Sequence, residues 1–228
     1  MQRLSQTKHS FTPLPKPKER AYSDIQKIPY LVYTQPLNPL TTFQQWFQEA
    51  ARDHRIDNAG VVNLATVSPS GLPSNRMVTL KKHDASGFVF FTHNSSHKGE
   101  DMKANPRTAL CFYWAPLGKQ IRVEGRVQPV GCEDADTYFS ELPRRDQVRA
   151  WISDQSKPIA SASQLDHEIM RHTERFDGVR IPRPASWTGF RIVPHTIEFC
   201  ERGEFGTYHR QSYERNADNT WTREALAP

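Results

Sequence analysis

The middle of the chain carries cationic, hydroxyl and amide side chains of the kind that hold a phosphorylated ring compound. They are Arg76, Lys81, Thr92, Lys98, Gln120, Gln155 and Ser156. A phosphate needs two or three charged or N–H donors, and a heteroaromatic ring needs amides along its edge. Taken singly, each residue is most simply explained as part of the surface. Only their ordered combination indicates a site for an anionic ligand that contains a ring.

Three common kinds of functional site have no counterpart in this sequence. It contains no G-x-S-x-G elbow, and none of its nine histidines lies in a recognisable nucleophile context. It has no H-E-x-x-H motif and no dense His/Asp/Glu cluster, so we expect no metal site. It also lacks a Walker loop and a GxGxxG motif, so a bound phosphate is not held by a glycine-rich loop.

Short strands are the elements expected to position these residues. Thr41-Thr42 read as the N-cap of an amphipathic helix that spans Phe43 to Ala50. After this helix, β-rich runs separated by turn residues predict an antiparallel meander. The expected strands span 61–67, 74–82, 88–92, 108–114 and 119–130. Arg76 and Lys81 fall on one of these strands at odd spacing, so they would point to opposite faces.

Helical patterns alternate with this meander. A short helix should start after Ser95-Ser96, where its first N–H groups and its dipole would favour an anion near Lys98. Further helices are expected over 133–141, 146–152 and 161–176, and the chain returns to β-structure from Trp187. We therefore predict a mainly β, α+β fold, an antiparallel β-barrel with peripheral helices.

Composition and charge limit the class of protein. The chain has 228 residues and a net charge of +5, and residues 1–20 hold five basic residues against one glutamate, which is +4. The remaining +1 is weak support for nucleic-acid binding, so we expect none. We expect a flexible, basic, proline-containing tail over 1–22 and one domain over 23–228.

Compartment is inferred from three further features of the sequence. The three cysteines are far apart and form no CxxC pair, which indicates a reducing compartment. No apolar run is long enough for a membrane span, and the N-terminus lacks the apolar region of a secretion signal. A cytoplasmic protein without a membrane partner is the expectation.

The ordered motifs resemble the pyridoxamine 5′-phosphate oxidase family, whose members are FMN enzymes built as split-barrel homodimers. The resemblance covers nearly the whole chain after about residue 40. Its motifs are Arg76-Met77-Val78-Thr79-Leu80-Lys81, Phe90-Phe91-Thr92, Ser96-His97-Lys98, the segment 119–125, Tyr138-Phe139, the segment 150–156, Trp187, Ile197-Glu198-Phe199, Arg210, Trp221 and Leu226-Ala227-Pro228.

This resemblance implies a cofactor site that is mostly intact. Arg76 and Lys98 would contact the FMN phosphate, and Gln120 would contact the flavin edge. Part of the site would come from the second subunit of a homodimer. The implied cofactor-binding residues are Arg76, Met77, Val78, Lys81, Phe91, Thr92, His97, Lys98, Gln120, Gln155, Ser156, Cys200 and Arg210. His97 replaces a family arginine, which keeps a donor but only sometimes a charge. Cys200 replaces a tryptophan, which removes a large flat contact near the flavin.

The substrate half departs further from the family. Lys81 and Tyr138 match the family's substrate-phosphate residues, but Leu142 and Asp146 replace an arginine and a serine. The family's Arg-x-His segment aligns with Gly206-Thr207-Tyr208. His209 lies one position late, which on a regular strand turns its side chain to the other face. We expect Tyr208 in the substrate site with Lys81, Tyr138, Leu142 and Asp146, and the candidates for catalysis are Tyr208 and His209.

Three functions follow from this mixture of matches and departures. The first is an FMN-dependent oxidase that passes a hydride from a small amine or reduced ring to FMN, which O2 reoxidises. Its substrate would not be a B6 phosphate, as in family members of secondary metabolism such as the phenazine-biosynthesis oxidases, although those keep the Arg-x-His. The second is a true pyridoxamine 5′-phosphate oxidase in which Arg144, Arg145 or Arg149 supplies the missing charge. The third is a flavin-binding protein without turnover.

Overall fold

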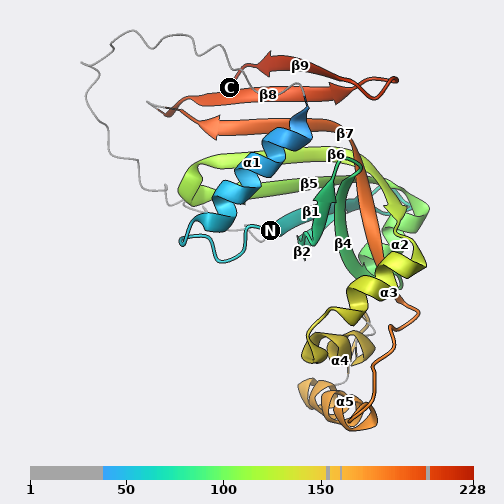
Figure 1. Cartoon of the computed structure of the whole chain (residues 1–228). Coiled ribbons are helices and arrows are strands. Elements are labelled where there is room, and N and C mark those ends of the chain that lie inside the picture. Colours follow the sequence, from blue (N-terminus) through green and yellow to red (C-terminus); the bar gives the residue numbers. More distant parts are fainter. Residues whose placement is uncertain (1–37, 153–154, 160, 204–205) are drawn as a thin grey trace, which may run out of the picture. The chain divides into compact units, whose positions relative to one another are not determined.

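An antiparallel sheet of nine strands forms the body of the computed structural model, which describes residues 38–152, 155–159, 161–203 and 206–228 (Figure 1). The predicted tail over 1–22 and its boundary at residue 23 lie outside the described residues. The strands are β1 (Val61–Val67), β2 (Pro73–Thr79), β3 (Lys82–Asp84), β4 (Gly87–His93), β5 (Arg107–Trp114), β6 (Lys119–Pro129), β7 (Trp187–Arg202), β8 (Tyr208–Arg215) and β9 (Trp221–Leu226). The helices are α1 (Pro39–Arg52), α2 (His97–Ala104), α3 (Cys132–Ser140), α4 (Arg144–Ile152) and α5 (Ala162–Arg175), with a 3-10 turn η1 (Ala115–Leu117).

Strand β7 organises the sheet because different strands pair with its two halves. The strand order is β2-β1-β5-β6-β7-β4-β3, and β8 joins β7 to β9. Strand β6 follows β7 along most of its length, from Phe190 to Glu201. On the other edge, β4 pairs with residues 187–192 and β8 pairs with residues 196–202. The sheet therefore divides along β7 and curls into a half-barrel (Figure 1), which confirms the predicted antiparallel barrel fold.

A glycine marks the bend between the two halves. The β6–β7 register shifts between Glu124 and Gly125, and Gly125 lies opposite Pro194. A Cβ atom at Gly125 would lie 2.4 Å from the carbonyl oxygen of Val193. Because that distance is far inside van der Waals contact, only glycine fits where the two strands approach each other here.

Helix α1 packs an aromatic stripe into the main core. Phe43 is fully buried, and its ring makes edge-on contacts with Phe88 and Phe112 at centroid distances of 4.8 and 5.2 Å. Trp46 packs edge-on against Phe199 of β7 at 5.2 Å. The apolar spacing that predicted a core helix is thus confirmed.

The predicted N-cap of this helix was wrong. The helix begins at Pro39, and the side chain of Asn38 accepts a hydrogen bond from the Leu40 amide at 3.0 Å. Proline suits the first helical position because its missing N–H needs no partner there. Thr42, one of the two expected caps, is buried inside the first turns instead.

The helices after β6 enclose a second hydrophobic cluster at the start of β7. Figure 1 shows α3, α4 and α5 grouped beside one end of the sheet. The buried members of the cluster are Phe139, Val148, Ala150, Phe176, Ile181 and Trp187. Arg144, at the start of α4, donates to the carbonyl oxygens of Phe176 and Val179 and so joins α4 to the end of α5.

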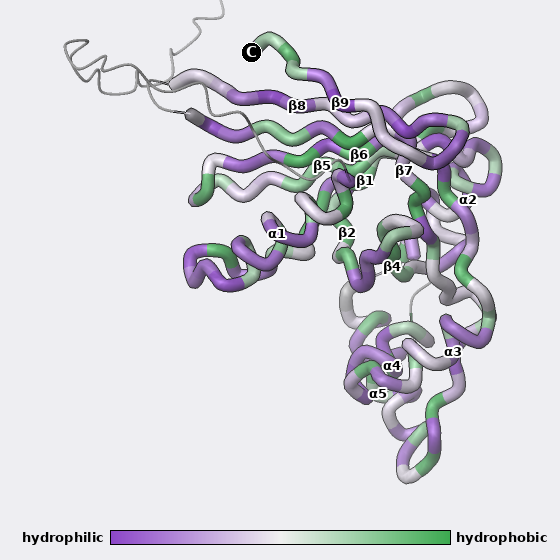
Figure 2. Tube along the Cα trace, turned by 45° about the horizontal axis from the view of Figure 1, so that its top comes forward, coloured by the Kyte–Doolittle hydropathy of each residue, from purple (hydrophilic) through white to green (hydrophobic). Residues whose placement is uncertain are grey.

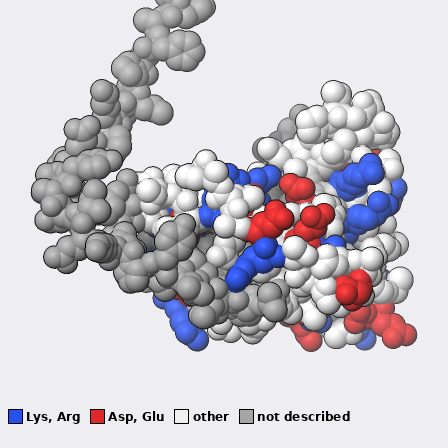
Figure 3. Space-filling view, turned by 90° about the horizontal axis from the view of Figure 1, so that it is seen from above, with Lys and Arg blue, Asp and Glu red and all other residues white. Residues whose placement is uncertain are grey.

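The strands show the alternation expected of a sheet with one buried face. Figure 2 shows hydrophobic and hydrophilic residues alternating along β5, β6 and β7, and β6 alternates buried and exposed positions from Ile121 to Gln128. On the face seen in Figure 3, basic and acidic side chains are interspersed rather than gathered by sign. Within the described residues, every helix is too short or too polar to cross a membrane.

The other predicted elements match the structure closely, with one exception. The strand expected over 74–82 is interrupted, because β2 ends at Thr79 and β3 begins at Lys82. Lys81 therefore does not share a strand with Arg76 as predicted. Its amide donates to the carbonyl oxygen of Val89 at 2.8 Å, and its side chain is exposed. The break arises because the chain leaves its pairing with β1 to begin pairing with β4.

Candidate functional site

Four of the predicted cofactor residues meet in one place, which we call the anion site (Arg76, Thr92, Lys98 and Gln155). Arg76 lies on β2, Thr92 near the end of β4, and Lys98 in the first turn of α2. The Lys98 ammonium donates to Oε1 of Gln155 at 2.8 Å, and the Thr92 hydroxyl donates to the same oxygen at 2.9 Å. Residues up to 63 positions apart in the sequence are thus brought together.

The Lys98 side chain is the strongest indication that this site takes an anion. The residue is only 8% exposed, and no carboxylate forms an ion pair with its ammonium in the described part of the chain. Burial, together with the nearby Arg76 guanidinium, lowers the pKa of Lys98 to about 8. A bound dianion would offset both effects, so the residues present fit the phosphate of a mononucleotide.

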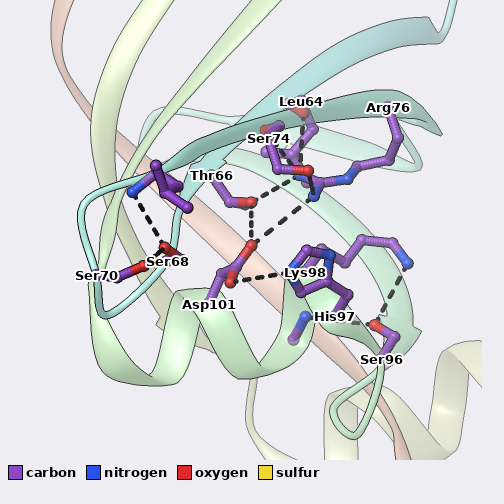
Figure 4. Close-up of polar contacts among 12 residues, drawn as sticks. Leu64, Thr66, Ser68, Ser70, Ser74, Arg76, Ser96, His97, Lys98 and Asp101 are labelled. Carbon is purple, nitrogen blue, oxygen red and sulfur yellow. Dashed lines mark hydrogen bonds and ion pairs between the residues drawn. The ribbon is translucent and has the colours of Figure 1, made fainter. Parts of the chain in front are cut away.

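Arg76 is held by a network on β1 and β2 (Figure 4). Its Nη1 donates to the Thr66 hydroxyl at 2.7 Å and, at longer range, to the carbonyl oxygens of Leu64 and Ser74. Its Nη2 donates to the Ser74 hydroxyl at 2.9 Å and lies 3.8 Å from Oδ2 of Asp101. Burial lowers the pKa of Arg76, and Asp101 partly offsets this shift.

The start of α2 faces the same network. Ser96 caps the helix by accepting from the Gly99 amide at 3.3 Å. The His97 side chain is 61% exposed, and its Nε2 lies 3.6 Å from Oδ1 of Asp101, four residues further along the helix. The helix thus presents its N-terminus, Lys98 and His97 toward the expected phosphate position.

The loop after α4 completes this side of the site. Gln155 is half-buried and accepts the two hydrogen bonds described above. The next residue, Ser156, is exposed and has a φ of 77°, in the left-handed region that disfavours residues other than glycine. Such strained backbone recurs in ligand-binding loops, and the role of Ser156 in cofactor binding stays a prediction.

A second group of predicted residues lines a pocket of about 430 Å³ at the other end of the sheet, which we call the C-terminal pocket. Its lining residues are Tyr113, Ala115, Gly118, Gln120, Cys200, Arg202, Tyr208, Arg210 and Pro228. Gln120 and Arg210 flank Cys200, because both pair with it from neighbouring strands. Burial and the nearby Glu198 carboxylate raise the pKa of the Cys200 thiol, so this thiol is not an activated nucleophile.

Arg210 is fixed in this pocket by ion pairing. Its Nε and Nη2 lie 2.9 and 2.8 Å from Oε1 of Glu198. Glu198 also accepts from Arg122 at 3.0 Å, and Arg210 donates to the carbonyl oxygen of Ala227 at 3.0 Å. The arginine therefore joins β8 to both β7 and the C-terminal residues.

The register of β8 separates the two candidates for catalysis. Pairing runs without a shift from Arg202 opposite Tyr208 to Thr196 opposite Glu214. Tyr208 lines the C-terminal pocket, whereas His209 does not. A Cβ atom built on Gly203 would lie 2.6 Å from Nε2 of His209, so the imidazole covers that glycine instead. Over the described pairs from Tyr208 to Glu214 the register contains no bulge that would turn His209 to the face of Tyr208.

Three of the expected substrate residues, Tyr138, Leu142 and Asp146, lie in the helical region of α3 and α4, whereas Lys81 and Tyr208 do not. Tyr138 on α3 stacks on Phe91 of β4 with a centroid distance of 4.1 Å and an angle of 6°. Burial, followed by the carboxylates of Glu141 and Asp146, raises the pKa of Tyr138. Leu142 packs against the second hydrophobic cluster. The surroundings of the tyrosine are thus aromatic and acidic.

Two further predicted residues belong to neither group. Met77 is 58% exposed and lines a pocket that adjoins the C-terminal pocket, since Tyr113 and Ala115 line both, while Val78 packs on the main core. The anion site and the C-terminal pocket lie toward opposite ends of β7, because Thr92 pairs with Thr188 and Arg210 pairs with Cys200. Within one chain, the structure does not bring Gln120, Cys200 and Arg210 to Arg76 and Lys98.

Sequence reasoning missed three residues that hold the predicted ones in place. Thr66 and Asp101 contact Arg76, and Glu198 holds Arg210. A partial signal existed for Asp101, since it lies three residues after Lys98 and four after His97 on one helix. Thr66 had no such signal, because only the β1–β2 pairing brings it to Arg76.

Comparisons with known proteins agree with these features. Residues 47–174 match the family model described as pyridoxamine 5′-phosphate oxidase. Residues 187–228 match the model described as pyridoxine 5′-phosphate oxidase C-terminal dimerisation region.

Two curated relatives carry the name pyridoxine/pyridoxamine 5′-phosphate oxidase. The protein from Myxococcus xanthus is 43% identical over 194 residues, which cover 85% of this chain and 93% of the relative. The protein from Granulibacter bethesdensis is 41% identical over 196 residues, which cover 84% of this chain and 91% of the relative.

Two solved structures share the fold. PhzG from Burkholderia lata, in complex with tetrahydrophenazine-1-carboxylic acid, has a TM-score of 0.80 and 26% identity over 86% of this chain and 95% of its own. An FMN-binding protein from Nostoc punctiforme, related to pyridoxamine 5′-phosphate oxidase, has a TM-score of 0.69 and 20% identity over 85% of this chain and 100% of its own.

Proposed function

This chain belongs to the pyridoxamine 5′-phosphate oxidase family and is an FMN-dependent oxidase, and we propose that its substrate is a small cationic amine without a phosphate group. When bound, FMN supplies the redox chemistry, since it accepts a hydride and passes the electrons to dioxygen. The protein's own residues bind the cofactor, orient the substrate and set its charge preference.

The two groups of cofactor residues have separate tasks. Arg76 and Lys98 of the anion site would hold the cofactor phosphate through charge-assisted hydrogen bonds. Gln120 and Arg210 of the C-terminal pocket would donate to the polar edge of the flavin ring. Tyr208 lines the same pocket and would pack against the substrate.

The observation that carries the substrate proposal is the acidic environment of Tyr138. Burial is the main cause that raises the pKa of its hydroxyl, and the carboxylates of Glu141 and Asp146 add to it, so both carboxylates lie near the tyrosine that matches the family's substrate-phosphate residue. The side chain of Leu142, nearby, can donate no hydrogen bond. A dianion would meet like charge there, whereas a primary ammonium group would be attracted.

Two of the basic residues of α4 already have other partners, which supports the proposal. Arg144 donates to two backbone carbonyl oxygens at the end of α5, and Arg149 lies 3.7 Å from Asp146. Lys81 is exposed and carries the one predicted substrate-site charge outside these helices. Arg149 already pairs with Asp146, so Lys81 would have to attract the phosphate in the presence of the remaining Glu141 carboxylate.

A homodimer would complete the site. The anion site and the C-terminal pocket lie toward opposite ends of β7 in one chain, and residues 187–228 match a dimerisation region. Two copies related by a two-fold axis could place the anion site of one against the C-terminal pocket of the other. We therefore place FMN at the subunit interface, with its phosphate in the anion site of one chain and its ring in the C-terminal pocket of the other.

The proposal is tested by reduction of the bound flavin without oxygen. Purified protein loaded with FMN is mixed anaerobically with unphosphorylated primary amines and with pyridoxamine and pyridoxine 5′-phosphates, and loss of flavin absorbance is followed. We expect bleaching by amines and slow or no bleaching by the phosphates. Rapid bleaching of the flavin by the two phosphorylated compounds, with none by the unphosphorylated amines, would refute the substrate proposal but not the assignment of the cofactor.

A true pyridoxine/pyridoxamine 5′-phosphate oxidase is the second candidate, favoured by the names and identity of the curated relatives and by the retained Lys81 and Tyr138. In that case Arg145 or Arg149 must supply phosphate charge. Replacing each with alanine should then raise KM for the phosphorylated substrate and leave kcat nearly unchanged. No change in KM for either variant would exclude this rewired pocket.

A further inference from the structure

Asp101 is a buried carboxylate inside a site built for an anion. Its side chain is 3% exposed, and in the described part of the chain the basic side chains within ion-pair distance of it are those of Arg76 on β2 and His97 on its own helix. A negative charge close to a phosphate weakens phosphate binding by direct repulsion. The carboxylate therefore needs another explanation than charge attraction to the ligand.

The hydrogen bonds of Asp101 give that explanation (Figure 4). The Thr66 hydroxyl donates to Oδ2 of Asp101 at 2.7 Å and accepts from Nη1 of Arg76 at 2.7 Å. A hydroxyl has one proton, so donating it to the carboxylate turns its lone pairs toward the arginine. Asp101 thus fixes the direction of the Thr66 hydroxyl, and the hydroxyl fixes the guanidinium.

The fixed guanidinium keeps donors for a ligand. The three acceptors around Nη1 use both of its N–H groups, and the Ser74 hydroxyl uses one N–H of Nη2. Among the contacts of the described residues, the Nε–H and the second Nη2–H of Arg76 have no acceptor within hydrogen-bond distance. Two adjacent N–H groups of an arginine match two oxygens of a phosphate.

We propose that Asp101 is a positioning residue for the cofactor phosphate, which orients the Arg76 guanidinium through the Thr66 hydroxyl. This inference rests on the cofactor site described under the proposed function. Through its other oxygen, 3.6 Å from Nε2 of His97, Asp101 also holds the imidazole at the edge of the same site. Its net effect is to strengthen phosphate binding, despite its charge.

The sign of one substitution separates positioning from charge. Asp101→Asn removes a negative charge, so electrostatics alone predicts tighter binding of FMN, whereas loss of positioning predicts weaker binding. The matched control is Glu100→Gln, which removes the same charge from the neighbouring, exposed position of α2. Riboflavin, which has the flavin ring but no phosphate, is the matched control ligand.

The experiment titrates full-length apoprotein with FMN and with riboflavin and follows flavin fluorescence. For Asp101→Asn we expect the FMN Kd to rise roughly tenfold, typical of losing one charge-assisted hydrogen bond, while the riboflavin Kd changes less than about twofold. Glu100→Gln should leave both constants within about twofold of wild type. Thr66→Val should mimic Asp101→Asn, and the double variant should lose no more than either single one.

Two results would overturn the proposal. An FMN Kd that is unchanged or lower in Asp101→Asn would show that the carboxylate acts only through its charge, or not at all. Equal weakening of FMN and riboflavin would show a general structural role. If wild-type protein binds FMN and riboflavin equally well, the anion site itself is refuted. That result would be a failure of the proposed cofactor site rather than of the role of Asp101, and it would be seen before any variant is made.

Discussion

The pKa of Lys98 leads to a quantitative prediction for cofactor binding. The free protein holds this lysine with a pKa lowered to about 8, and only the protonated form can pair with a phosphate dianion. Binding of FMN therefore takes up a proton, and affinity must fall as pH rises through the pKa of the free protein. The protonated fraction is about 91% at pH 7 and about 9% at pH 9, so the FMN Kd should rise about tenfold between them.

The assay is a fluorescence titration of apoprotein with FMN at pH 7, 8 and 9 and at constant ionic strength. The phosphate of FMN remains a dianion over this range, because its second pKa is near 6. Riboflavin serves as the control ligand, and its Kd should not follow this trend. Lys98→Met removes the titrating group while keeping a side chain of similar length, so its FMN Kd should be high and independent of pH.

A wild-type FMN Kd that stays constant from pH 7 to 9 would refute this reasoning. It would mean that Lys98 remains charged in the free protein, in spite of its burial and the neighbouring Arg76. A pH dependence that persists in Lys98→Met would instead assign the proton to another group.

Three further predictions concern the sheet and the C-terminal pocket. Gly125→Ala should lower the free energy of unfolding by roughly 1–3 kcal/mol, because the new Cβ would lie 2.4 Å from a carbonyl oxygen. Gly131→Ala is the comparison, because its new Cβ would meet only a side-chain oxygen of Asp134 at 3.9 Å; losing glycine from the N-cap of α3 should cost no more than about 1 kcal/mol, and chemical denaturation measures both variants. Phe43→Ala should cost roughly 3–5 kcal/mol in the same assay, because the ring is fully buried between two others, and a loss below about 1 kcal/mol would contradict its place in the core. Tyr208→Ala should lower kcat/KM for the amine substrate roughly tenfold, whereas His209→Ala should lower it less than about twofold, because only Tyr208 lines the C-terminal pocket. A larger effect of His209→Ala would contradict the observed β8 register.

The sequence was most informative where the pattern is local. Alternation over residues 61–67 predicted β1 with its observed ends, and the serine before His97 predicted the cap of α2. The start of α1 was missed because Asn38 and Pro39 form a stronger start signal than the two threonines that follow. The break before Lys81 was not predictable, since it reflects a change of pairing partner rather than a local pattern.

Four of the predicted site residues meet in the structure, but the arrangement of the whole set was not predictable. Arg76, Thr92, Lys98 and Gln155 were expected to act together, and they do meet. Their separation from Gln120 and Arg210 follows from the pairing along β7, which no residue spacing reveals. The support that Thr66, Asp101 and Glu198 give was missed for the same reason, because it depends on contacts across strands and helices.

The acidic surroundings of Tyr138 are the basis of the central claim, and one comparison tests it most directly. Pyridoxamine and pyridoxamine 5′-phosphate differ only in the phosphate, so the ratio of their second-order rates of anaerobic flavin reduction isolates its effect. We predict that wild-type protein reacts at least as fast with pyridoxamine, and that Leu142→Arg with Asp146→Ser reverses the preference. A wild-type preference of about 100-fold or more for the phosphorylated form would contradict the proposed substrate class.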